Sequence, residues 1–425
     1  MTQTDKSKSL RILCLISAWI AMPVLSLAQQ APSPYRWVGS WAASPQLCEP
    51  QNSIAQEDAD HVVLRQIVHL SLGGSSLRME ISNEFGTQPL EFTAAHVALA
   101  TSPATSAIAP ATDKTVTFSG LSNISIPAGA KYVSDPVSLS VTAGADLAIT
   151  MAFDHIPQRQ TGHPGSRATS YLAHGVSPEI AELAQSKHIE HWFFLSGVSV
   201  TTTPSAAAVV ALGDSITDGH GATTNGNDRW PDNLARRLHD SNLSVLNEGI
   251  GGNRLLADGL GPNALSRFDR DVLAQPGVRY VVVLEGINDL GTATRASELS
   301  TAQHAVLVQR IISAYAQLIV RAHEHGLPVF LGTITPFVGS DYYHPNADTE
   351  NDRQQINAWI RAIGHADALI DFDKAVADPA HPERLLPAFD SGDHLHPSPA
   401  GYRAMSDAIS LSFFAPAASK RPAAK

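Results

Sequence analysis

The pattern of apolar and polar positions changes character about halfway along the chain. From about residue 36 to about residue 205, short runs rich in β-branched and aromatic residues alternate with turn signals such as Gly73-Gly74. Because no helical period separates these runs, the pattern predicts an all-β, sandwich-like domain of antiparallel strands over residues 36–205. The strands are predicted at residues 62–72, 76–85, 94–100, 131–141, 146–153 and 192–202.

The second half of the chain has the alternation of an α/β domain. Residues 207–212 and 280–284 are continuous apolar runs, as expected of parallel strands that are buried on both faces. The alternation of strands and helices predicts a parallel sheet of about five strands over residues 206–414. Further strands are predicted at 244–246, 328–331 and 368–371, and helices at 230–239, 264–273, 301–325, 351–363 and 399–413.

Two short segments are interpreted as connections. Residues 201–205 read Thr-Thr-Thr-Pro-Ser, which is typical of a linker, and they would join the two domains. Residues 415–425 are rich in Ala, Lys and Pro and are expected to form a loose tail. The chain shows no internal repeat.

The first residues have the pattern of an export signal. Residues 6–11 carry three basic side chains, residues 12–25 are mostly apolar, and Ala28 completes a small-x-small cleavage site. A membrane-spanning helix is the alternative, but the run is shorter than the roughly 20 apolar residues that a span needs and it contains Pro23. We therefore expect residues 1–28 to be a cleaved signal peptide. The protein would then be exported, to the periplasm or outside the cell, with no stable membrane anchor.

Charge and cysteine content narrow the classes of partner. The 425 residues have a formal net charge of -11 and include 2 Cys. A negative chain disfavours nucleic acid, whose affinity comes from neutralised phosphates, and also an anionic membrane surface. Cys14 falls within the predicted signal, so Cys48 would remain alone, and we interpret it as a small, partly buried hydrophobe rather than a reactive thiol. Nothing in the sequence indicates an oligomeric state.

A candidate nucleophile follows the first strand of the α/β half. Ser215 stands in the sequence Gly-Asp-Ser-Ile-Thr-Asp-Gly, directly after the apolar run 207–212. A serine at that strand end lies where open α/β sheets bind ligands, and the flanking glycines allow a sharp turn. Taken alone, Gly-Asp-Ser is equally typical of an ordinary turn.

A candidate base lies near the other end of the chain. A serine hydroxyl needs a base to become a nucleophile. Asp393 stands three residues before His396, close enough to fix the imidazole tautomer and to stabilise the imidazolium that forms. Two alternatives stay open at this point: His396 as an exposed loop histidine, and a metal site made by His394 and His396. No third or fourth ligand for such a metal is obvious.

Two further segments offer donors for an oxyanion. The glycines before Gly252 permit close backbone approach, so that the Gly252 amide could face the oxyanion, and the side-chain amide of Asn288 could be a second donor. Each segment is also compatible with a simple turn. All these residues follow consecutive strands or a late loop, however, and the carboxyl ends of parallel strands share one edge of a sheet. We therefore expect them to converge.

These segments together resemble the signature of the SGNH (GDSL-type) hydrolase superfamily. Gly213-Asp214-Ser215 resembles its first block, Gly252 its second, Gly286-Ile287-Asn288-Asp289 its third, and Asp393-His394-Leu395-His396 its fifth. The resemblance implies a flavodoxin-like three-layer α/β/α fold and a Ser215–His396–Asp393 triad. It also implies ester hydrolysis without a metal or cofactor. The oxyanion donors would be the backbones of Ser215 and Gly252 and the side chain of Asn288.

A closer resemblance concerns a bacterial subgroup of lysophospholipase-like or xylanase-linked esterases, whose members carry a β-rich region before the catalytic half. Segments that resemble it are Trp37-Val38-Gly39-Ser40-Trp41, Asn253-Arg254-Leu255-Leu256 and Arg267-Phe268-Asp269-Arg270-Asp271. This resemblance does not fix a substrate. No Gly-x-Ser-x-Gly is present, so the nucleophile elbow of ordinary α/β-hydrolases is not the alternative.

The function expected from these features is that of an exported serine esterase acting through an acyl-enzyme. Its substrate would be a small-molecule or polysaccharide ester, with short-chain or acetyl esters of carbohydrate favoured. Trp230, Tyr342 and Tyr343 could stack on sugar rings, although they suit the packing of a long loop equally well. Two other functions stay open: a lysophospholipase or lipase, which an apolar acyl groove would favour, and a non-catalytic glycan-binding protein.

Overall fold

A parallel sheet organises the second half of the chain in the computed structural model, which describes Thr2 and residues 35–415. The strand order is β17-β16-β18-β19-β20, which is the 2-1-3-4-5 order of flavodoxin-like folds. The strands are β16 (Ala207–Gly213), β17 (Leu243–Gly249), β18 (Val278–Leu284), β19 (Val329–Gly332) and β20 (Ala368–Ile370). The strand interiors are almost wholly apolar because helices cover both faces of the sheet. The predicted three-layer α/β/α fold is confirmed.

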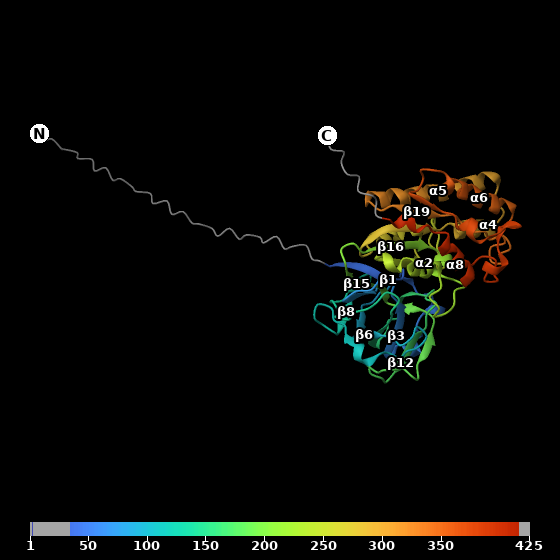
Figure 1. The fold of residues 1–425 in the computed structure, drawn as a ribbon. Helices are drawn as coiled ribbons and strands as arrows, with labels where there is room; N and C mark the ends of the chain where they lie inside the picture. The colour runs from blue at the N-terminus through green and yellow to red at the C-terminus, as the bar shows by residue number, and fades with distance from the viewer. Residues whose placement is uncertain (1, 3–34, 416–425) are drawn as a thin grey trace. The chain divides into compact units, whose positions relative to one another are not determined.

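Two groups of helices form the outer layers (Figure 1). One layer holds α3 (Ala264–Phe268), α4 (Ile287–Ala296), α5 (Thr301–Glu324) and α6 (Ala347–Arg361). The other holds α2 (Trp230–Arg237), α7 (Phe372–Val376) and α8 (Pro399–Asp407), and the short α1 (Ser215–Asp218) follows β16. The boundaries follow capping chemistry: the Ser398 side chain accepts from the Gly401 amide at the start of α8, where Pro399 occupies the first turn.

The helices differ from the sequence expectation in several places, and the helix predicted at 399–413 ends at Asp407. The predicted helix 264–273 is α-helical only to Phe268 and continues as a π-helical turn, Asp269–Leu273. Helix α6 begins four residues early because Asn346 caps it, with its side chain accepting from the Thr349 amide. Helix α4 was not expected, because Gly291 and two threonines give it a weak helical propensity.

Within residues 35–415, one helix is long and apolar enough to cross a membrane by length and composition alone, namely α5. Its buried side chains recur on one face, as in Leu307, Ile311, Ala314 and Leu318, and that face packs against the sheet and α6. The helix therefore has the burial pattern of a core helix.

The first half is rich in antiparallel strands, as predicted. A four-stranded sheet has the order β1-β15-β4-β9 and a six-stranded sheet the order β13-β12-β3-β10-β6-β7. Smaller sheets are β14-β11-β2 and β5-β8. Val62 and Leu64 of the larger sheet share one hydrophobic cluster with Met79 and Val198 of the smaller one, so the two sheets enclose a common core. The bounds are β1 (Arg36–Ala42), β2 (Gln46–Leu47), β3 (Asp60–His69), β4 (Leu77–Ser82), β5 (Leu90–Phe92), β6 (Ala94–Leu99), β7 (Lys114–Thr115), β8 (Ile124–Ile126), β9 (Lys131–Val133), β10 (Asp146–His155), β11 (Thr161–His163), β12 (Ser170–His174), β13 (Lys187–Ile189), β14 (Trp192–Phe193) and β15 (Leu195–Thr202).

Three segments correct the sequence expectation for this half. The predicted strand 131–141 ends at Val133, shortly before Pro136, which lacks the amide that a ladder needs. The strand predicted at 192–202 is interrupted at Phe194, whose φ of 58° is left-handed. The linker prediction for 201–205 was wrong in part, because Thr201 and Thr202 belong to β15 and pair with β1. The predicted signal peptide, residues 1–28, lies outside the described residues apart from Thr2, and so do residues 416–425 of the tail.

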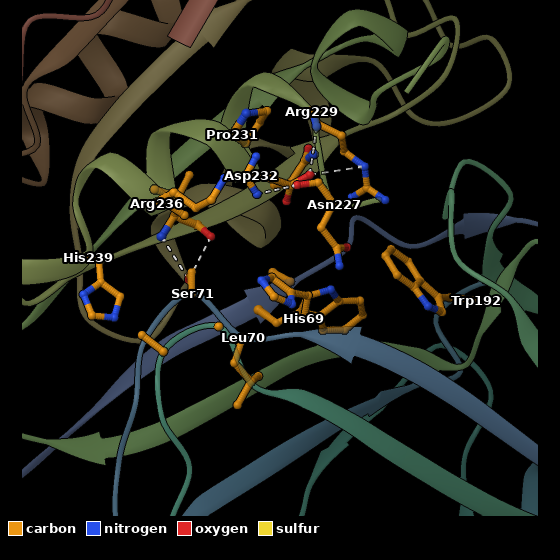
Figure 2. A pocket seen from close by; sticks show the side chains of 17 residues that line it. His69, Leu70, Ser71, Trp192, Asn227, Arg229, Pro231, Asp232, Arg236 and His239 are labelled. Atoms are coloured by element: carbon orange, nitrogen blue, oxygen red, sulfur yellow. Dashed lines mark hydrogen bonds and ion pairs between the residues drawn. The ribbon is translucent and has the colours of Figure 1, made fainter. Parts of the chain in front are cut away.

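The β-rich half packs directly on the α/β half, and both belong to one compact unit that starts at Tyr35. Strand β1 lies against β17, where the Gly39 amide donates to the Pro276 carbonyl (2.8 Å). A neighbouring cavity has a volume of about 70 Å³, and Trp192 of the β-rich half and Arg229 at the start of α2 both line it. Figure 2 shows these two side chains on the same side of the cavity. The Arg229 guanidinium lies 5.6 Å from the Trp192 ring centroid, within cation–π range.

A buried hydrogen bond between a histidine and a carboxylate also crosses this interface. His163 Nε2 lies 2.9 Å from Asp218 Oδ1, and each side chain is only 4% exposed. His163 Nδ1 lies 2.9 Å from the Ser44 carbonyl, so both ring nitrogens face oxygen acceptors. Asp218 stands three residues after Ser215, and the β-rich half therefore reaches the segment that carries the candidate nucleophile.

Candidate active site

Ser215 is the first residue of α1 and follows β16 directly. The Asp214 side chain caps this helix by accepting from the Ile216 amide (2.9 Å), and Gly219, with a φ of 101°, ends it after one turn. The chain is crowded here: a Cβ added to Gly249 of β17 would stand 2.3 Å from the Asp218 amide nitrogen. Sheet, cap and close packing together hold Ser215 at the carboxyl edge of the sheet, as predicted.

Hydrogen bonds connect Ser215 to His396 and Asp393. Ser215 Oγ lies 2.8 Å from His396 Nε2, and His396 Nδ1 lies 2.6 Å from Asp393 Oδ2. The other carboxylate oxygen of Asp393 accepts from the backbone amides of Leu395 (3.0 Å) and His396 (2.8 Å). Burial raises the pKa of Asp393, but the hydrogen bonds and charge of His396 outweigh it and hold that pKa well below its usual value. Asp393 is therefore an ionised acceptor at neutral pH.

The two predicted donors lie in the same pocket as Ser215. Gly252 adopts a φ of 69°, a left-handed conformation that glycine reaches without strain. Within the described residues its amide has no acceptor, and the Ser215 amide, at the first helical position, has none inside the helix. Asn288 Nδ2 donates to the Asn253 carbonyl (2.8 Å), which leaves its second N–H for the pocket.

Tyr343 fixes the orientation of the Asn288 amide. Its hydroxyl donates to Asn288 Oδ1 (2.6 Å), so that the nitrogen, and not the oxygen, faces Asn253. The Tyr343 ring lies flat on α4, where a Cβ added to Gly291 would stand 2.3 Å from it. The sequence suggested Tyr343 only as an aromatic platform, because the contact joins residues 55 positions apart.

We expect Tyr343→Phe to lower kcat about tenfold and Asn288→Ala to lower it about 100-fold or more, with little change in KM. Tyr343→Phe removes the hydroxyl that orients the Asn288 side-chain amide, and Asn288→Ala removes that oxyanion donor itself. An oxyanion donor acts mainly in the transition state, so the effect appears in kcat. Steady-state kinetics on a soluble acetate ester would measure both effects. Tyr342→Phe is the matched control, because the Tyr342 side chain is 59% exposed and its ring, not its hydroxyl, contacts Arg295. Equal effects at 342 and 343 would contradict the positioning role.

The pocket has a volume of about 640 Å³. Its lining includes Tyr342 and two leucines, Leu260 and Leu395, as well as the polar side chains of His220 and Asp341. Trp230, also suggested as a sugar platform, is wholly buried and packs against Phe372 at 5.5 Å between ring centroids. It is therefore a core residue, and that interpretation of Trp230 was wrong.

A family model matches most of the α/β half of the chain. Residues 211–404 match the model of the GDSL-like Lipase/Acylhydrolase family. We call these residues the GDSL-like domain, after the family whose model they match. No curated protein matches the chain.

The GDSL-like domain is also similar to solved structures. A GDSL-like lipase from Bacteroides thetaiotaomicron has 20% identity and a TM-score of 0.37, covering 49% of this chain and 87% of its own. A lipase/acylhydrolase from Enterococcus faecalis has 20% identity and a TM-score of 0.35, covering 48% and 92%. The acetyl xylan esterase AlAXEase has 21% identity and a TM-score of 0.35, covering 47% and 96%.

A wholly buried arginine joins three segments of the GDSL-like domain. Arg267 donates to the Gly213 carbonyl (2.9 Å), just before the nucleophile turn, and to Asn253 Oδ1 (2.8 Å), beside the oxyanion donors. It also donates to Asp271 Oδ2 (2.9 Å) and lies 3.4 Å from Glu285 Oε1. The sequence drew attention to the segment 267–271 only through a family resemblance and gave no role for Arg267. It acts as a positioning residue, because it holds the backbone on which Ser215 stands.

Buried carboxyl groups surround this arginine. Burial raises the pKa of Asp214 to about 7, and the charge of Asp289 adds to the rise, against the hydrogen bond from Ile216. Burial likewise raises the pKa of Asp289 to about 6, although it accepts from two backbone amides. The GDSL-like domain thus keeps carboxyl groups next to its nucleophile that ionise near neutral pH.

The Asp214 pKa predicts a pH-dependent stability. Because burial raises the pKa of Asp214, its carboxyl group keeps a proton in the folded state at pH values where it is already ionised in the unfolded chain. The stability that this proton contributes is lost as the pH rises from about 4 to about 7. Asp214→Asn keeps the capping oxygen but cannot ionise. We expect it to reduce the fall in unfolding free energy between pH 5 and pH 8 by on the order of 2 kcal/mol. Urea unfolding would measure it, with exposed Asp240→Asn as control; equal pH dependence in all three proteins would contradict it.

His220 lies beside the Ser215–His396 pair. Its ring centroid is 4.0 Å from that of His396, and its Nδ1 accepts from the Arg167 guanidinium of the β-rich half (3.0 Å). Burial, followed by the charges of His396 and Arg167, lowers the pKa of His220 to about 4, so the ring is neutral at neutral pH. The sequence did not indicate that His220 lies beside His396, because His220 stands in a glycine-flanked turn.

The structure also bears on the alternative interpretations of the histidines and of Cys48. His394 Nδ1 lies 2.5 Å from Asp390 Oδ2, and both ring nitrogens of His396 are hydrogen-bonded to other side chains. These two histidines are therefore not arranged as a pair of metal ligands. His220, Asp393 and His396 do offer ligand atoms within 4.8 Å of one another. Cys48 is buried, and burial, with the charge of Glu49, raises its pKa to about 12, which agrees with an unreactive thiol.

Proposed function

We propose that the protein is a serine esterase that hydrolyses carboxylic esters through an acyl-enzyme formed on Ser215. The observation that carries the proposal is the continuous path of hydrogen bonds from Ser215 Oγ through both ring nitrogens of His396 to Asp393. With its Nδ1 proton held by Asp393, His396 presents an unprotonated Nε2 to the serine hydroxyl.

The reaction then follows from the positions of these groups. His396 Nε2 takes the Ser215 proton while Oγ attacks the ester carbonyl carbon. The oxyanion is stabilised by the backbone amides of Ser215 and Gly252 and by the free N–H of Asn288. His396 returns the proton to the leaving alkoxide, and water, activated by the same base, hydrolyses the acyl-enzyme.

For the substrate we propose short-chain esters, and acetyl esters of carbohydrate in particular. The pocket beside Ser215 is lined by polar groups, Asp341 and Asp393 among them, as well as by apolar ones. Long acyl chains need a continuous apolar surface, which these carboxylates interrupt. The AlAXEase structure, named as an acetyl xylan esterase, is consistent with this proposal.

The experiment is an acyl-chain series on the purified protein. We expect p-nitrophenyl acetate and butyrate to be hydrolysed faster than the laurate, and acetate to be released from acetylated xylan. Ser215→Ala provides the background rate. Hydrolysis that continues at the wild-type rate in Ser215→Ala would overturn the serine mechanism.

A lysophospholipase-type acyl hydrolase is the second candidate. It is favoured by two exposed apolar side chains at the pocket, Leu260 (55% exposed) and Tyr342 (59% exposed), which could contact an acyl chain. A higher kcat/KM on the laurate than on the acetate, together with turnover of lysophosphatidylcholine, would select this candidate over the first.

We also propose that the protein is exported, on the basis of the basic and apolar pattern of residues 6–28. The expected result is a mature N-terminus at Gln29 in the exported fraction, measured by intact mass. A chain that keeps Met1 and stays in the cytoplasm would contradict this.

A further inference from the structure

A second cleft opens beside the nucleophile and is shared between the two halves of the chain. It has a volume of about 240 Å³, and Ser215, His220, Gly251 and Leu260 line both this cleft and the larger pocket. Ser215 therefore lies at the boundary between the two. The opposite wall of the smaller cleft comes from the β-rich half, with the polar side chains of Gln46, Glu49, Asn52, Arg167 and His191.

The β-rich wall carries one charge of each sign with hydrogen-bonding capacity to spare. Within residues 35–415, neither Glu49 nor Arg167 has an oppositely charged partner within 4.0 Å. Glu49 Oε2 accepts from Asn52 Nδ2 (2.6 Å), and its other oxygen has no donor among the described residues. Arg167 donates to His220, and its buried Nε has no acceptor there. An Arg has five N–H donors, so most of its capacity is unused.

Backbone and packing hold Arg167 in place. Its φ of 48° lies in the left-handed region, which a residue with a side chain adopts only when its surroundings impose it. The Arg167 carbonyl accepts from the Asn225 amide (2.8 Å), and a Cβ added to neighbouring Gly165 would stand 1.8 Å from Asp218 Oδ2. The β-rich loop is thus fixed against the nucleophile segment, and its charged groups are preorganised beside Ser215.

We infer that this cleft binds the alcohol part of the ester, and that this part is a neutral polyhydroxylated group such as a sugar; the inference rests on the esterase function proposed above. A sugar hydroxyl can donate to the Glu49 carboxylate while another accepts from Arg167, so both unpaired charges are satisfied together. The Glu49 carboxylate would repel an anionic alcohol group. A hydrocarbon group would remove water from the charges of Glu49 and Arg167 without forming a hydrogen bond to either. The cleft also passes the His220 ring, which lies against His396, the group that protonates the leaving oxygen.

The test compares two acetate esters that differ only in the alcohol. Ethyl acetate and mono-O-acetyl methyl β-xyloside present the same acyl group, so the ratio of their kcat/KM values reports on the alcohol site. We expect the wild type to prefer the xyloside, and Glu49→Gln and Arg167→Met each to lower that ratio at least tenfold, the loss of one hydrogen bond to a charged group. Glu57→Gln is the matched control, since Glu57 is an exposed glutamate of the same N-terminal segment and lies outside the cleft.

The outcomes separate this inference from the esterase proposal. If the wild type hydrolyses both esters and both cleft variants keep the wild-type ratio, the inference is overturned while the esterase function stands. If neither ester is hydrolysed, the esterase proposal fails, and binding of methyl β-xyloside to Ser215→Ala decides the inference by NMR titration. Binding that is weakened at least tenfold by Arg167→Met supports the sugar site, and absence of binding overturns it.

Discussion

Replacement of Ser215 by Ala is expected to lower kcat/KM on p-nitrophenyl acetate by a factor on the order of 10⁴–10⁶. The change removes the nucleophile, so no acyl-enzyme forms, and what remains is the catalysis that the oxyanion donors give to direct attack by water. At about 1.4 kcal/mol for each factor of ten, the loss corresponds to roughly 5–8 kcal/mol of transition-state stabilisation. Steady-state kinetics with enough enzyme to measure the residual rate would determine it.

A second readout identifies the nucleophile directly. A fluorophosphonate should label the wild type once, with a mass increase on the peptide that contains Ser215, and should not label Ser215→Ala. Ser410→Ala, a change at an exposed serine near the C-terminal end of the described chain, should label like the wild type. Among the described residues, the oxygen removed by Ser215→Ala is hydrogen-bonded only to His396, so the melting temperature of this variant should stay close to that of the wild type. Labelling that persists in Ser215→Ala would assign the nucleophile to another residue.

The candidate site was predictable where its residues follow consecutive strands. Ser215 and Asn288 lie within four residues of the ends of β16 and β18, and parallel strands bring their carboxyl ends to one edge. Asp393 and His396 were predictable as a pair because they stand three positions apart just before a capped helix. The structure brings all four into one pocket with Gly252. Chain order and strand polarity were sufficient for this part.

What escaped prediction depends on contacts between distant parts of the chain. Strand β1 pairs with β15 at the other end of the β-rich half, and nothing in the residues 36–42 identifies that partner. The Tyr343–Asn288 and Arg167–His220 contacts likewise join separate loops, so their roles emerge only after packing. Local pattern reports periodicity and turn chemistry, while partner choice depends on the whole fold.

The same reason explains why the sequence treated the two halves as separable. A composition change near residue 205 marks a change of architecture, from antiparallel strands to an α/β sheet. It does not report that the polar side chains of the first half face the second, as His163 faces Asp218. The β-rich half therefore contributes to the site as a wall, and its buried polar contacts make the interface part of the fold.

Replacement of Arg267 by Met is expected to destabilise the fold by about 3–5 kcal/mol, because it removes the buried positive charge beside Asp271 and Glu285 together with its hydrogen bonds to Gly213 and Asn253. Arg267 and Glu285 are completely buried, and the Asp271 side chain is 1% exposed. Burial raises the pKa of Glu285 well above its usual value, and the charge of Asp214 raises it further, while Arg267 opposes both. The loss should appear as a melting temperature lower by on the order of 10 °C in calorimetry.

Two further variants make the Arg267 result interpretable. Arg267→Lys keeps the charge but cannot reach Gly213, Asn253 and Asp271 together, so its loss should be smaller than that of Arg267→Met and still measurable. Arg321→Met is the matched control, because Arg321 of α5 pairs with the exposed Asp269, which is close in sequence to Arg267. This substitution should lower the free energy of unfolding by no more than about 1 kcal/mol. If Arg267→Met and Arg321→Met have the same melting temperature, the buried network around Arg267 is not what stabilises the nucleophile turn. The carboxyl groups around Arg267 must then be protonated in the folded protein.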